Sequence, residues 1–582
     1  MLPLGFGTRR CQGRLSTRSS PLTRTPPFRA QGHNTTPPDI TRPRLLIVSG
    51  NLALLRGHYE GVIAALVRRG VQVSIRYRRD SGLSAEEYRA TLRDAGIVAE
   101  VAALPNPPRR AADVFGVGLR ELGNILRFAH PDYAGRDRLN ERAYEKKGQG
   151  ARRWGRRILR LGPRPALAAG RFVSWIEATL PAPRYAVDLL AEEHATAVAV
   201  APVIRTPVLV DFLKAGAQLR VATAIWVQSW DNLTNKGLLH FSPDRVFVWN
   251  ERQKAELDRY HGVDGDRVCV TGAQTFDHWF SDAAPVSRAE FCARMGIDVN
   301  APIVLYLSSS KQIAPEEPTF FASWLEAVRS SDEQRLRSAT ILVRPHPTMV
   351  EAWYASGVDR EPDVVLSPAT RKDQLNSAAF REQYRAELHH ATLAFGVNTS
   401  GLIDAAIFGK PTLTVEVPEL FHGQRGTVHF EHLARSEGGL LRTSSTLKEH
   451  VEELAELIQR DPYAADDRSR EFVGAFVRPH GLESRPTEVF AEEMDALCRT
   501  LTTVSPPTGV RRAFGLTLSV AAPFASARAR KRLYKRSRHA PLALARRVLP
   551  ARVRHLLRRA LTTSASRRGR TRLAESEGGE HL

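Results

Sequence analysis

Cysteine is scarce in this chain of 582 residues, and long apolar stretches are missing. The four cysteines lie far apart, with no CxxC pair and no histidine at metal-ligand spacing. This pattern argues against a disulfide framework and a structural zinc site, and it suits a reducing compartment. The longest apolar candidate, Ala513–Ala527, contains Pro523 and is shorter than the roughly 20 residues that a membrane-spanning helix needs. No spanning helix is therefore predicted.

Several catalytic motifs are also absent. The chain contains no GxxxxGK[ST] phosphate loop, no HExxH and no GxSxG. The loop after the first predicted strand lacks GxGxxG, which disfavours a dinucleotide-dependent oxidoreductase. None of these motifs therefore indicates the chemistry of this chain.

Acidic residues are missing from both ends of the chain. Residues 1–38 hold six arginines and no acid, and residues 505–572 hold nineteen lysines and arginines and no acid. The net charge of +22 therefore belongs to the ends, and residues 39–504 carry no net charge. We expect residues 1–41 to form a disordered basic leader, with a transit peptide as the alternative.

The basic tail at residues 505–582 has an internal pattern. Apolar side chains recur at helical spacing between Leu544 and Leu561, with arginines between them, although Pro550 interrupts the pattern. A basic amphipathic segment of this kind is typical of binding to anionic lipid headgroups. A disordered tail without a fixed partner is the alternative, and the near absence of aromatic residues argues against nucleic acid.

Strand and helix patterns alternate along the neutral part of the chain. The apolar run Arg44–Ser49, a helical pattern over Tyr59–Arg69 and the run Val71–Tyr77 predict a right-handed βαβ unit. A region rich in Arg, Gly and Pro follows at about 105–185 and is predicted to be a helical insertion with a basic surface. The alternation then resumes, and a second series begins at Ile303–Ser308.

Two such series predict an α/β fold of two doubly wound, Rossmann-like domains that face a cleft. We place the first domain at residues 42–280 and the second at 281–504. Three helical patterns, of which the last spans Pro486–Leu501, are expected to close the second domain.

The richest strand end is the segment FGVNTSGLIDAAIFGK at Phe395–Lys410. A buried strand runs through Asn398, Thr399 and Ser400 directly into an apolar helix, which leaves backbone N–H groups facing the cleft. Such a turn binds a diphosphate, and Asp404 one turn later would face a ribose or sugar hydroxyl. The alternative is that Asn398 or Ser400 only caps the helix.

Two further strand ends in the second half carry polar residues. Arg344 and His346 lie in the sequence RPHP after an apolar strand, and Ser309 and Lys311 follow the strand at Ile303–Ser308. We expect all four to contribute to binding an anionic donor. A structural pair with a carboxylate is the alternative for Arg344.

Candidate bases lie in the first half. Asp231 and Asn232 belong to the polar loop WVQSWDNLTNKG, and Asp231 is the best-placed carboxylate for accepting a proton from an attacking hydroxyl. The alternative for Asp231 is a turn or capping role. His58 is the second candidate base, although a lone histidine at a helix start is more often structural.

One more loop is expected at the cleft. The segment FHGQRGTVHF carries Gln424, Thr427 and His429, which would line the same cleft. No cluster of carboxylates, histidines or cysteines suggests a bound metal.

These strand-end motifs together resemble those of bacterial surface-carbohydrate glycosyltransferases of the GT-B superfamily. They are more distantly similar to CDP-glycerol glycerophosphotransferases and to non-hydrolysing UDP-N-acetylglucosamine 2-epimerases. The resemblance covers roughly residues 42–500, without the insertion or the basic ends. The motifs occur in the expected order: RLLIVSGN, VQSWDNLTNKG, DRVFVWNERQKAEL, VTGAQTFDHWF, VRPHP and FGVNTSGLIDAAIFGKP.

The resemblance implies a donor nucleotide on the C-terminal domain, an acceptor on the N-terminal domain, and transfer between them. His346 matches the donor-phosphate motif of the glycerophosphotransferases. Where that family has a histidine in the first half, this chain has Ser229-Trp230-Asp231, which suggests Asp231 as a substitute base.

The expected function is transfer of a sugar from a nucleoside diphosphate donor to a cell-envelope glycan or lipid-linked acceptor. No bound cofactor or metal is expected, and the nucleotide sugar is a co-substrate. The expected location is the inner face of a bacterial plasma membrane, with residues 505–572 on anionic lipid. The alternatives are a nucleotide-sugar 2-epimerase, a polyol-phosphate transferase and a non-catalytic scaffold of the same fold.

Overall fold

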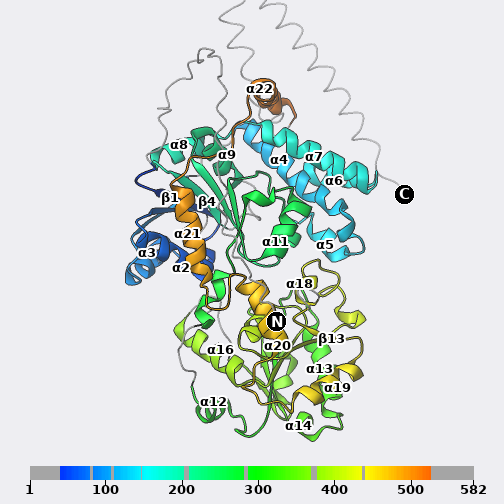
Figure 1. Cartoon of the computed structure of the whole chain (residues 1–582). Coiled ribbons are helices and arrows are strands. Elements are labelled where there is room, and N and C mark those ends of the chain that lie inside the picture. The colour runs from blue at the N-terminus through cyan, green and yellow to red at the C-terminus, as the bar shows by residue number, and fades with distance from the viewer. Residues whose placement is uncertain are drawn as a thin grey trace, which may run out of the picture. The chain divides into compact units, whose positions relative to one another are not determined.

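The computed structural model describes residues 40–78, 83–105, 110–145, 147–201, 209–280, 286–368, 377–434 and 439–525 (Figure 1). Almost all of the predicted leader, and the basic tail beyond residue 525 with its amphipathic pattern, lie outside the described residues. The described residues all belong to one compact unit, which contains two β-sheets.

The first sheet has seven parallel strands in the order β3-β2-β1-β4-β5-β6-β7. Because the chain starts in the middle of the sheet and winds outward in both directions, the sheet is doubly wound. Every residue of β1 after Arg44 and every residue of β4 and β5 is buried, as expected for central parallel strands covered on both faces. The strands are β1 (Arg44–Ser49), β2 (Gln72–Tyr77), β3 (Ala99–Ala103), β4 (Ala197–Ala201), β5 (Ala222–Trp226), β6 (Arg245–Val248) and β7 (Val268–Val270).

Helices connect these strands. Gly70 ends the first crossover helix pair at a φ of +83°, which glycine adopts without strain. Ser84 and Glu87 form a reciprocal capping box at the start of the next helix. The helices are α1 (Leu52–His58), α2 (Glu60–Arg68), α3 (Ala85–Asp94), α8 (Arg184–Glu192), α9 (Val210–Leu219), α10 (Asn232–Asn235) and α11 (Glu251–Glu256).

The second sheet has six parallel strands in the order β10-β9-β8-β11-β12-β13. The strands are β8 (Ile303–Leu307), β9 (Thr340–Arg344), β10 (Val364–Leu366), β11 (Leu393–Gly396), β12 (Thr412–Val415) and β13 (Arg442–Ser444). The helices are α12 (Arg288–Met295), α13 (Glu317–Arg329), α14 (Gln334–Arg337), α15 (Val350–Ser356), α16 (Ala378–His390), α17 (Gly401–Ile407), α18 (Phe430–Ala434), α19 (Leu447–Leu457) and α20 (Asp467–Phe472). Two doubly wound parallel sheets in sequence confirm the predicted α/β fold class with two Rossmann-like halves.

The predicted insertion is helical. It contains α4 (Ala111–Leu126), α5 (Asp137–Arg142), α6 (Gln149–Leu159) and α7 (Pro163–Thr179). Buried charges tie it to the first sheet, because Arg120 of α4 donates to Glu177 of α7 and, at 2.7 Å, to Asp211 of α9. Lys214 of α9 donates to the same Glu177 at 3.0 Å.

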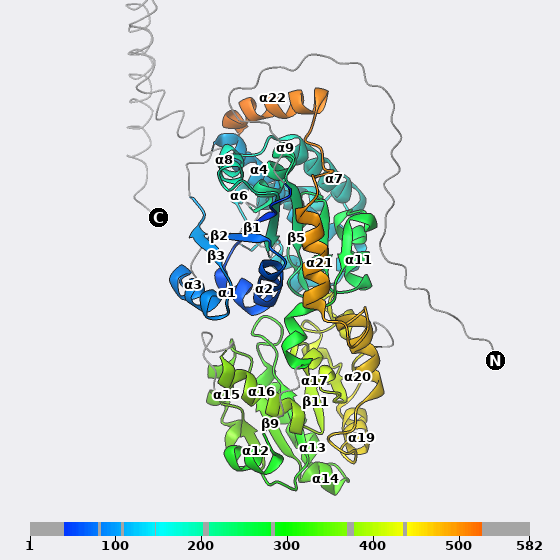
Figure 2. The ribbon, with the colours of Figure 1, turned by 60° about the vertical axis from the view of Figure 1, so that its left-hand side comes forward.

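Helix α21 (Pro486–Cys498) corrects one expectation. It packs on α2, and its apolar residues Phe490 and Met494 belong to the core of the first sheet rather than closing the second half (Figures 1 and 2). The expectation was wrong because an amphipathic pattern shows that a helix is packed but not which sheet receives it. The proposed boundaries at residues 42–280 and 281–504 stay predictions.

The start of the basic tail is a packed helix. Helix α22 (Gly509–Ala525) lies against α4 and α7 of the insertion. Among the described residues, no helix has both the length and the apolar character required to cross a bilayer.

Candidate active site

A pocket of about 230 Å³ lies where loops after strands of both sheets meet. Asp231 from the loop after β5 and Asn398, Thr399 and Ser400 from the turn after β11 all line it. The remaining lining residues are Arg142, Ser229, Trp230, Asn235, Lys236, Ser310, Gln312, Ile313, His346 and His429. The main predicted donor turn and the main predicted base therefore share one pocket.

The Asp231 carboxylate accepts hydrogen bonds from its own loop. Asn232 Nδ2 donates to Oδ1 at 2.9 Å, and Asn235 Nδ2 donates to Oδ2 at 2.6 Å. Lys236 Nζ forms an ion pair with Oδ2 at 3.0 Å. Burial raises the pKa of Asp231, but the Lys236 cation and the hydrogen bonds outweigh burial and hold the pKa well below its usual range. The side chain is therefore an ionised carboxylate and a weak base.

His429 faces the same pocket from the end of the loop that carries Gln424. Its ring packs edge-on against Trp230, with 5.0 Å between the ring centroids. Burial lowers the pKa of His429 to about 3, against the opposing effect of the Asp231 charge. Its Nδ1 is buried without a hydrogen-bond partner among the described residues. A neutral imidazole with an unused nitrogen thus lies beside the ionised carboxylate.

Hydrogen bonds to neighbouring loops fix the position of the Asn398–Ser400 turn. Asn398 is buried, and its Nδ2 donates to the Gly423 carbonyl at 2.6 Å and to Thr427 Oγ1 at 3.3 Å. Its backbone N–H donates to Ser309 Oγ at 3.1 Å. Asn398 and Thr427 therefore position the turn and the loop 421–430 relative to each other.

Thr399 and Ser400 are the more accessible members of the turn. Ser400 is the N-cap residue of α17, yet its side chain makes no capping hydrogen bond. The backbone N–H groups of Thr399 and Ser400 donate to no acceptor in the described part of the chain. These groups are available to an anion that enters the pocket.

His346 reaches the pocket from the loop after β9. Its Nδ1 accepts a hydrogen bond from the backbone N–H of Thr348 at 3.1 Å, which places the ring proton of the neutral form on Nε2. Its neighbour in the motif behaves differently. Arg344 forms an ion pair with buried Glu387 at 2.5 Å, and its guanidinium lies 3.9 Å from the Tyr384 ring centroid. Arg344 is not among the pocket-lining residues, so the structure favours the alternative of a structural pair.

Asp404 also points away from the pocket. Its two oxygens accept hydrogen bonds from Trp279 Nε1 at 2.7 Å and from the Tyr384 hydroxyl at 3.0 Å. Burial raises the pKa of Asp404 to about 7. The expected contact with a ribose or sugar hydroxyl would require these two partners to leave.

The other predicted site residues support the pocket or lie outside it. Ser309 is fully buried, and Lys311 is exposed outside the pocket. Asn232 donates a hydrogen bond to the Asp231 carboxylate. Gln424 is buried and donates to Thr414 Oγ1 and the Val415 carbonyl, both at 2.9 Å. His58 lies away from the pocket, hydrogen-bonded to Thr275 at 2.9 Å, and burial lowers its pKa to about 4.

The insertion contributes residues that the sequence did not indicate. Arg142 of α5 lines the pocket and donates to Gln312 at 3.1 Å. Arg136 donates to the carbonyls of Arg425 and Thr427, which braces the loop 421–430 from the insertion side. Lys236 is the second cation in the pocket. The sequence showed that Lys236 lies in a polar loop, but it did not predict the ion pair between Lys236 and Asp231.

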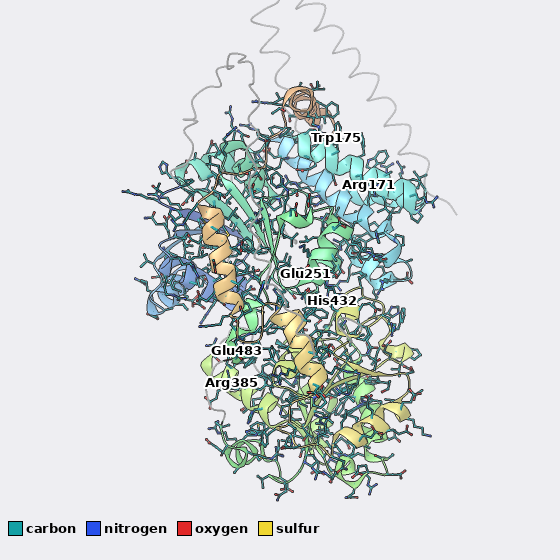
Figure 3. All side chains as sticks on the ribbon, viewed as in Figure 1. Arg171, Trp175, Glu251, Arg385, His432 and Glu483 are labelled. Carbon is teal, nitrogen blue, oxygen red and sulfur yellow. The ribbon has the colours of Figure 1, made fainter. Side chains whose placement is uncertain are left out.

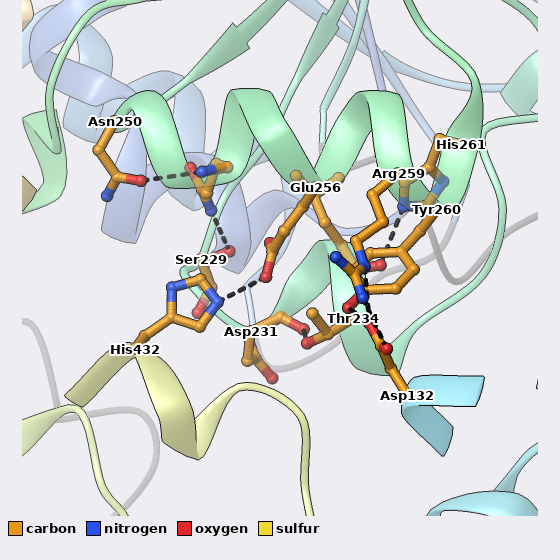
Figure 4. Close-up of polar contacts among 12 residues, drawn as sticks. Asp132, Ser229, Asp231, Thr234, Asn250, Glu256, Arg259, Tyr260, His261 and His432 are labelled. Atoms are coloured by element: carbon orange, nitrogen blue, oxygen red, sulfur yellow. Dashed lines mark hydrogen bonds and ion pairs between the residues drawn. The ribbon is translucent and has the colours of Figure 1, made fainter. Parts of the chain in front are cut away.

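Behind the Asp231 loop, the two halves are also joined by a buried hydrogen bond between a histidine and a carboxylate. His432 Nε2 of α18 lies 2.6 Å from Glu256 Oε1 of α11 (Figure 4). On the same helix, Gln253 donates to the Ser229 carbonyl at 3.1 Å, which fixes the start of the Asp231 loop. These contacts position Trp230 and Asp231 from the protein interior.

Among the described residues, no group of three or more histidine, cysteine, aspartate or glutamate side chains is arranged to hold a metal ion. No family model matches the chain, and no curated protein matches it.

The chain is similar to several solved structures. The UDP-GlcNAc 2-epimerase from Methanocaldococcus jannaschii matches 78% of this chain and 99% of its own, with 10% identity and a TM-score of 0.43. A glycosyltransferase from Rickettsia africae matches 78% of this chain and 98% of its own, with 9% identity and a TM-score of 0.43. MurG from Acinetobacter baumannii matches 78% of this chain and 99% of its own, with 12% identity and a TM-score of 0.38.

Proposed function

We propose that this chain is a metal-independent glycosyltransferase that moves a sugar from a nucleoside diphosphate donor to a cell-envelope glycan or lipid-linked acceptor. One observation carries the proposal: the Asp231 loop of the first sheet and the Asn398–Ser400 turn of the second line a single pocket. Donor and acceptor groups from the two halves can therefore meet at one place.

The donor diphosphate would bind on the side of the second sheet. The unused N–H groups of Thr399 and Ser400 and the side chain of His346 offer donors to phosphate oxygens. Lys236 and Arg142 add two positive charges at the pocket wall. Donors and cations that are fixed before the reaction stabilise the charge that develops on the leaving diphosphate.

A base must take the proton from the acceptor hydroxyl. Asp231, the base predicted from the sequence, is a poor proton acceptor because Lys236 and its hydrogen bonds hold its pKa so low. The neutral imidazole of His429 is the stronger base of the two. We propose that His429 accepts the proton and that ionised Asp231 stabilises the imidazolium that forms. The negative charge of a bound diphosphate would oppose the effect of burial and raise the pKa of His429.

The remaining partners are part of the same proposal. Residues 505–572 would hold the protein on the anionic inner face of a bacterial plasma membrane, although most of that segment lies outside the described residues. No bound cofactor is proposed, and turnover should be unchanged by EDTA.

The test combines donor binding with product analysis. Nucleotide sugars are screened by calorimetry against the wild-type chain and against the double variant Ser400→Ala, His346→Ala, which we expect to bind the donor more weakly. Turnover is then followed by nucleoside diphosphate release in the presence of lipid-linked or glycan acceptors. Unchanged donor affinity in the double variant would remove the donor-site assignment.

The same assay separates the alternatives. Interconversion of a nucleotide sugar without any acceptor would indicate an epimerase, and release of a nucleoside monophosphate would indicate polyol-phosphate transfer. Donor binding without turnover under any condition would indicate a scaffold. Loss of turnover with retained donor binding in His429→Asn would support the assigned base.

A further inference from the structure

The insertion carries a strongly basic helix face. Between residues 146 and 176 the sequence holds seven arginines, two lysines and no acid. Five of these arginines lie on one side of α6 and its C-cap, where they border a shallow groove of about 390 Å³. The groove is lined by Gln149, Arg152, Arg153, Arg156, Arg157 and Arg160. This face is strongly positive, whereas residues 39–504 taken together carry no net charge.

Large apolar side chains are exposed on α6, on the turn after it and on α7. Trp154 of α6 is 56% exposed beneath the Arg157 guanidinium, and Leu161 at the turn between α6 and α7 is 68% exposed. On α7, Phe172 is 59% and Trp175 is 40% exposed. Exposed apolar side chains that gather in one region mark an interaction surface.

Helix α22 extends the apolar part of this surface. The Phe514 ring lies 5.5 Å from the Trp175 ring, which in turn stacks on Phe172 at 6.0 Å between centroids. Figure 2 shows α22 lying across the insertion, and Figure 3 places Arg171 and Trp175 on α7 in the region beneath it. Val510 and Leu516 of α22 are 85% and 50% exposed.

The docking of α22 is a close fit. A side chain on Gly515 would place its Cβ 1.9 Å from the Thr179 carbonyl oxygen, so only glycine permits this approach. Leu518 of the same helix packs into the small core that α4 and α7 share. The aromatic cluster is therefore assembled by a specific contact between two segments that lie far apart in the sequence.

We infer that the outward faces of α6, α7 and α22 form a docking surface for an anionic lipid bilayer. Arginine side chains bind lipid phosphates, and tryptophan and phenylalanine side chains enter the interfacial layer. This combination favours lipid over nucleic acid, because the Phe172, Trp175 and Phe514 rings pack against one another instead of offering open faces to bases. The surface belongs mainly to the insertion, so it is distinct from the arginine-rich segment beyond residue 525. It does not rest on the proposed sugar transfer.

The first test is vesicle flotation of the full chain, with phosphatidylcholine vesicles that contain or lack phosphatidylglycerol. The variant Arg153→Glu, Arg157→Glu, Arg160→Glu should lower binding to the anionic vesicles by about tenfold or more, since each cation near the surface contributes to attraction. A control with the same charge change on exposed residues elsewhere, Arg93→Glu, Arg335→Glu, Arg360→Glu, should bind nearly as well as the wild type.

Equal binding of the α6 variant and the wild type, or equal losses in the variant and its control, would overturn the inference. So would binding of the wild-type chain to a single-stranded RNA oligonucleotide with no binding to anionic vesicles. Because all six substituted arginines are at the surface, unchanged circular dichroism is expected for both variants.

A second measurement reports on insertion of the aromatic residues. Brominated lipids should quench tryptophan fluorescence of the wild-type chain, and the variant Trp154→Phe, Trp175→Phe should lose most of this quenching. Gly515→Val, which is expected to displace α22, should weaken vesicle binding while leaving α6 intact. Undiminished quenching in the tryptophan variant would show that another face meets the membrane.

Discussion

The buried carboxyl of Glu317 predicts a stability change that depends on pH. Glu317 is fully buried at the start of α13, and its Oε2 accepts hydrogen bonds from the backbone N–H of Ser309 at 2.7 Å and from the Ser308 hydroxyl at 3.3 Å. These contacts hold the loop after β8, whose next residue, Ser310, lines the pocket. Burial raises the pKa of Glu317 from its ordinary value of 4.5 to about 8, against the smaller effect of these hydrogen bonds.

The sign of the effect follows from proton linkage. The folded state binds the proton on Glu317 more tightly than the unfolded state does. Below pH 4.5 the carboxyl is therefore largely protonated in both states and takes little from the free energy of unfolding. As the pH rises toward 8, the free energy of unfolding falls. A pKa difference of 3.5 corresponds to about 5 kcal/mol of stability lost above pH 8. Glu317→Gln keeps an acceptor for the Ser309 N–H but does not ionise. It should therefore be nearly neutral at pH 5 and strongly stabilising at pH 8.5.

The assay is urea unfolding at pH 5 and pH 8.5, with stabilities compared between variants so that other titrating groups cancel. Glu326→Gln serves as the control, because it makes the same substitution at an exposed position of the same helix. A stability difference between Glu317→Gln and the wild type that stays constant over this range would refute the reasoning.

Three further predictions concern buried contacts and the pocket. Arg120→Met leaves the Glu177 carboxylate short of its main partner and should cost about 3–5 kcal/mol in urea unfolding; an unchanged midpoint would contradict this. Lys236→Met removes a cation that lowers the pKa of both Asp231 and His429, so the acid limb of the turnover profile should move to higher pH; an unmoved limb would contradict the role of this pair in turnover. Gly155→Val would bring Cβ within 2.6 Å of a side chain of α4, and should lower stability by about 1–3 kcal/mol without changing donor affinity.

The local patterns in the sequence were sufficient for most elements. Continuous apolar runs such as those of β1 and β8 predict buried parallel strands, and the predicted run Arg44–Ser49 coincides with β1. Strand β3 was not predicted because its sequence, AEVAA, is short, half-exposed and poor in β-branched residues. The position of α21 on the first sheet depends on contacts between segments that are far apart in sequence, which periodicity does not encode.

The candidate site likewise contains residues whose place the sequence indicated and residues whose place it did not. Residues at strand ends, such as Asp231 and Ser400, were found because parallel strands end at a common edge. Arg344 and Asp404 lie in equally suggestive motifs, but their partners Glu387 and Trp279 come from other elements. Arg142 was missed because it belongs to an insertion that has no recognisable motif.

The most direct test of the account is nucleoside diphosphate binding to the pocket. UDP, GDP, CDP and ADP are titrated calorimetrically into the wild-type chain, into Ser400→Trp, which fills the pocket from an exposed position, and into Ser445→Trp, which lies outside it. The account predicts that at least one of these nucleotides binds the wild type and Ser445→Trp but not Ser400→Trp. Binding of none of them, or equal binding to all three proteins, would contradict it.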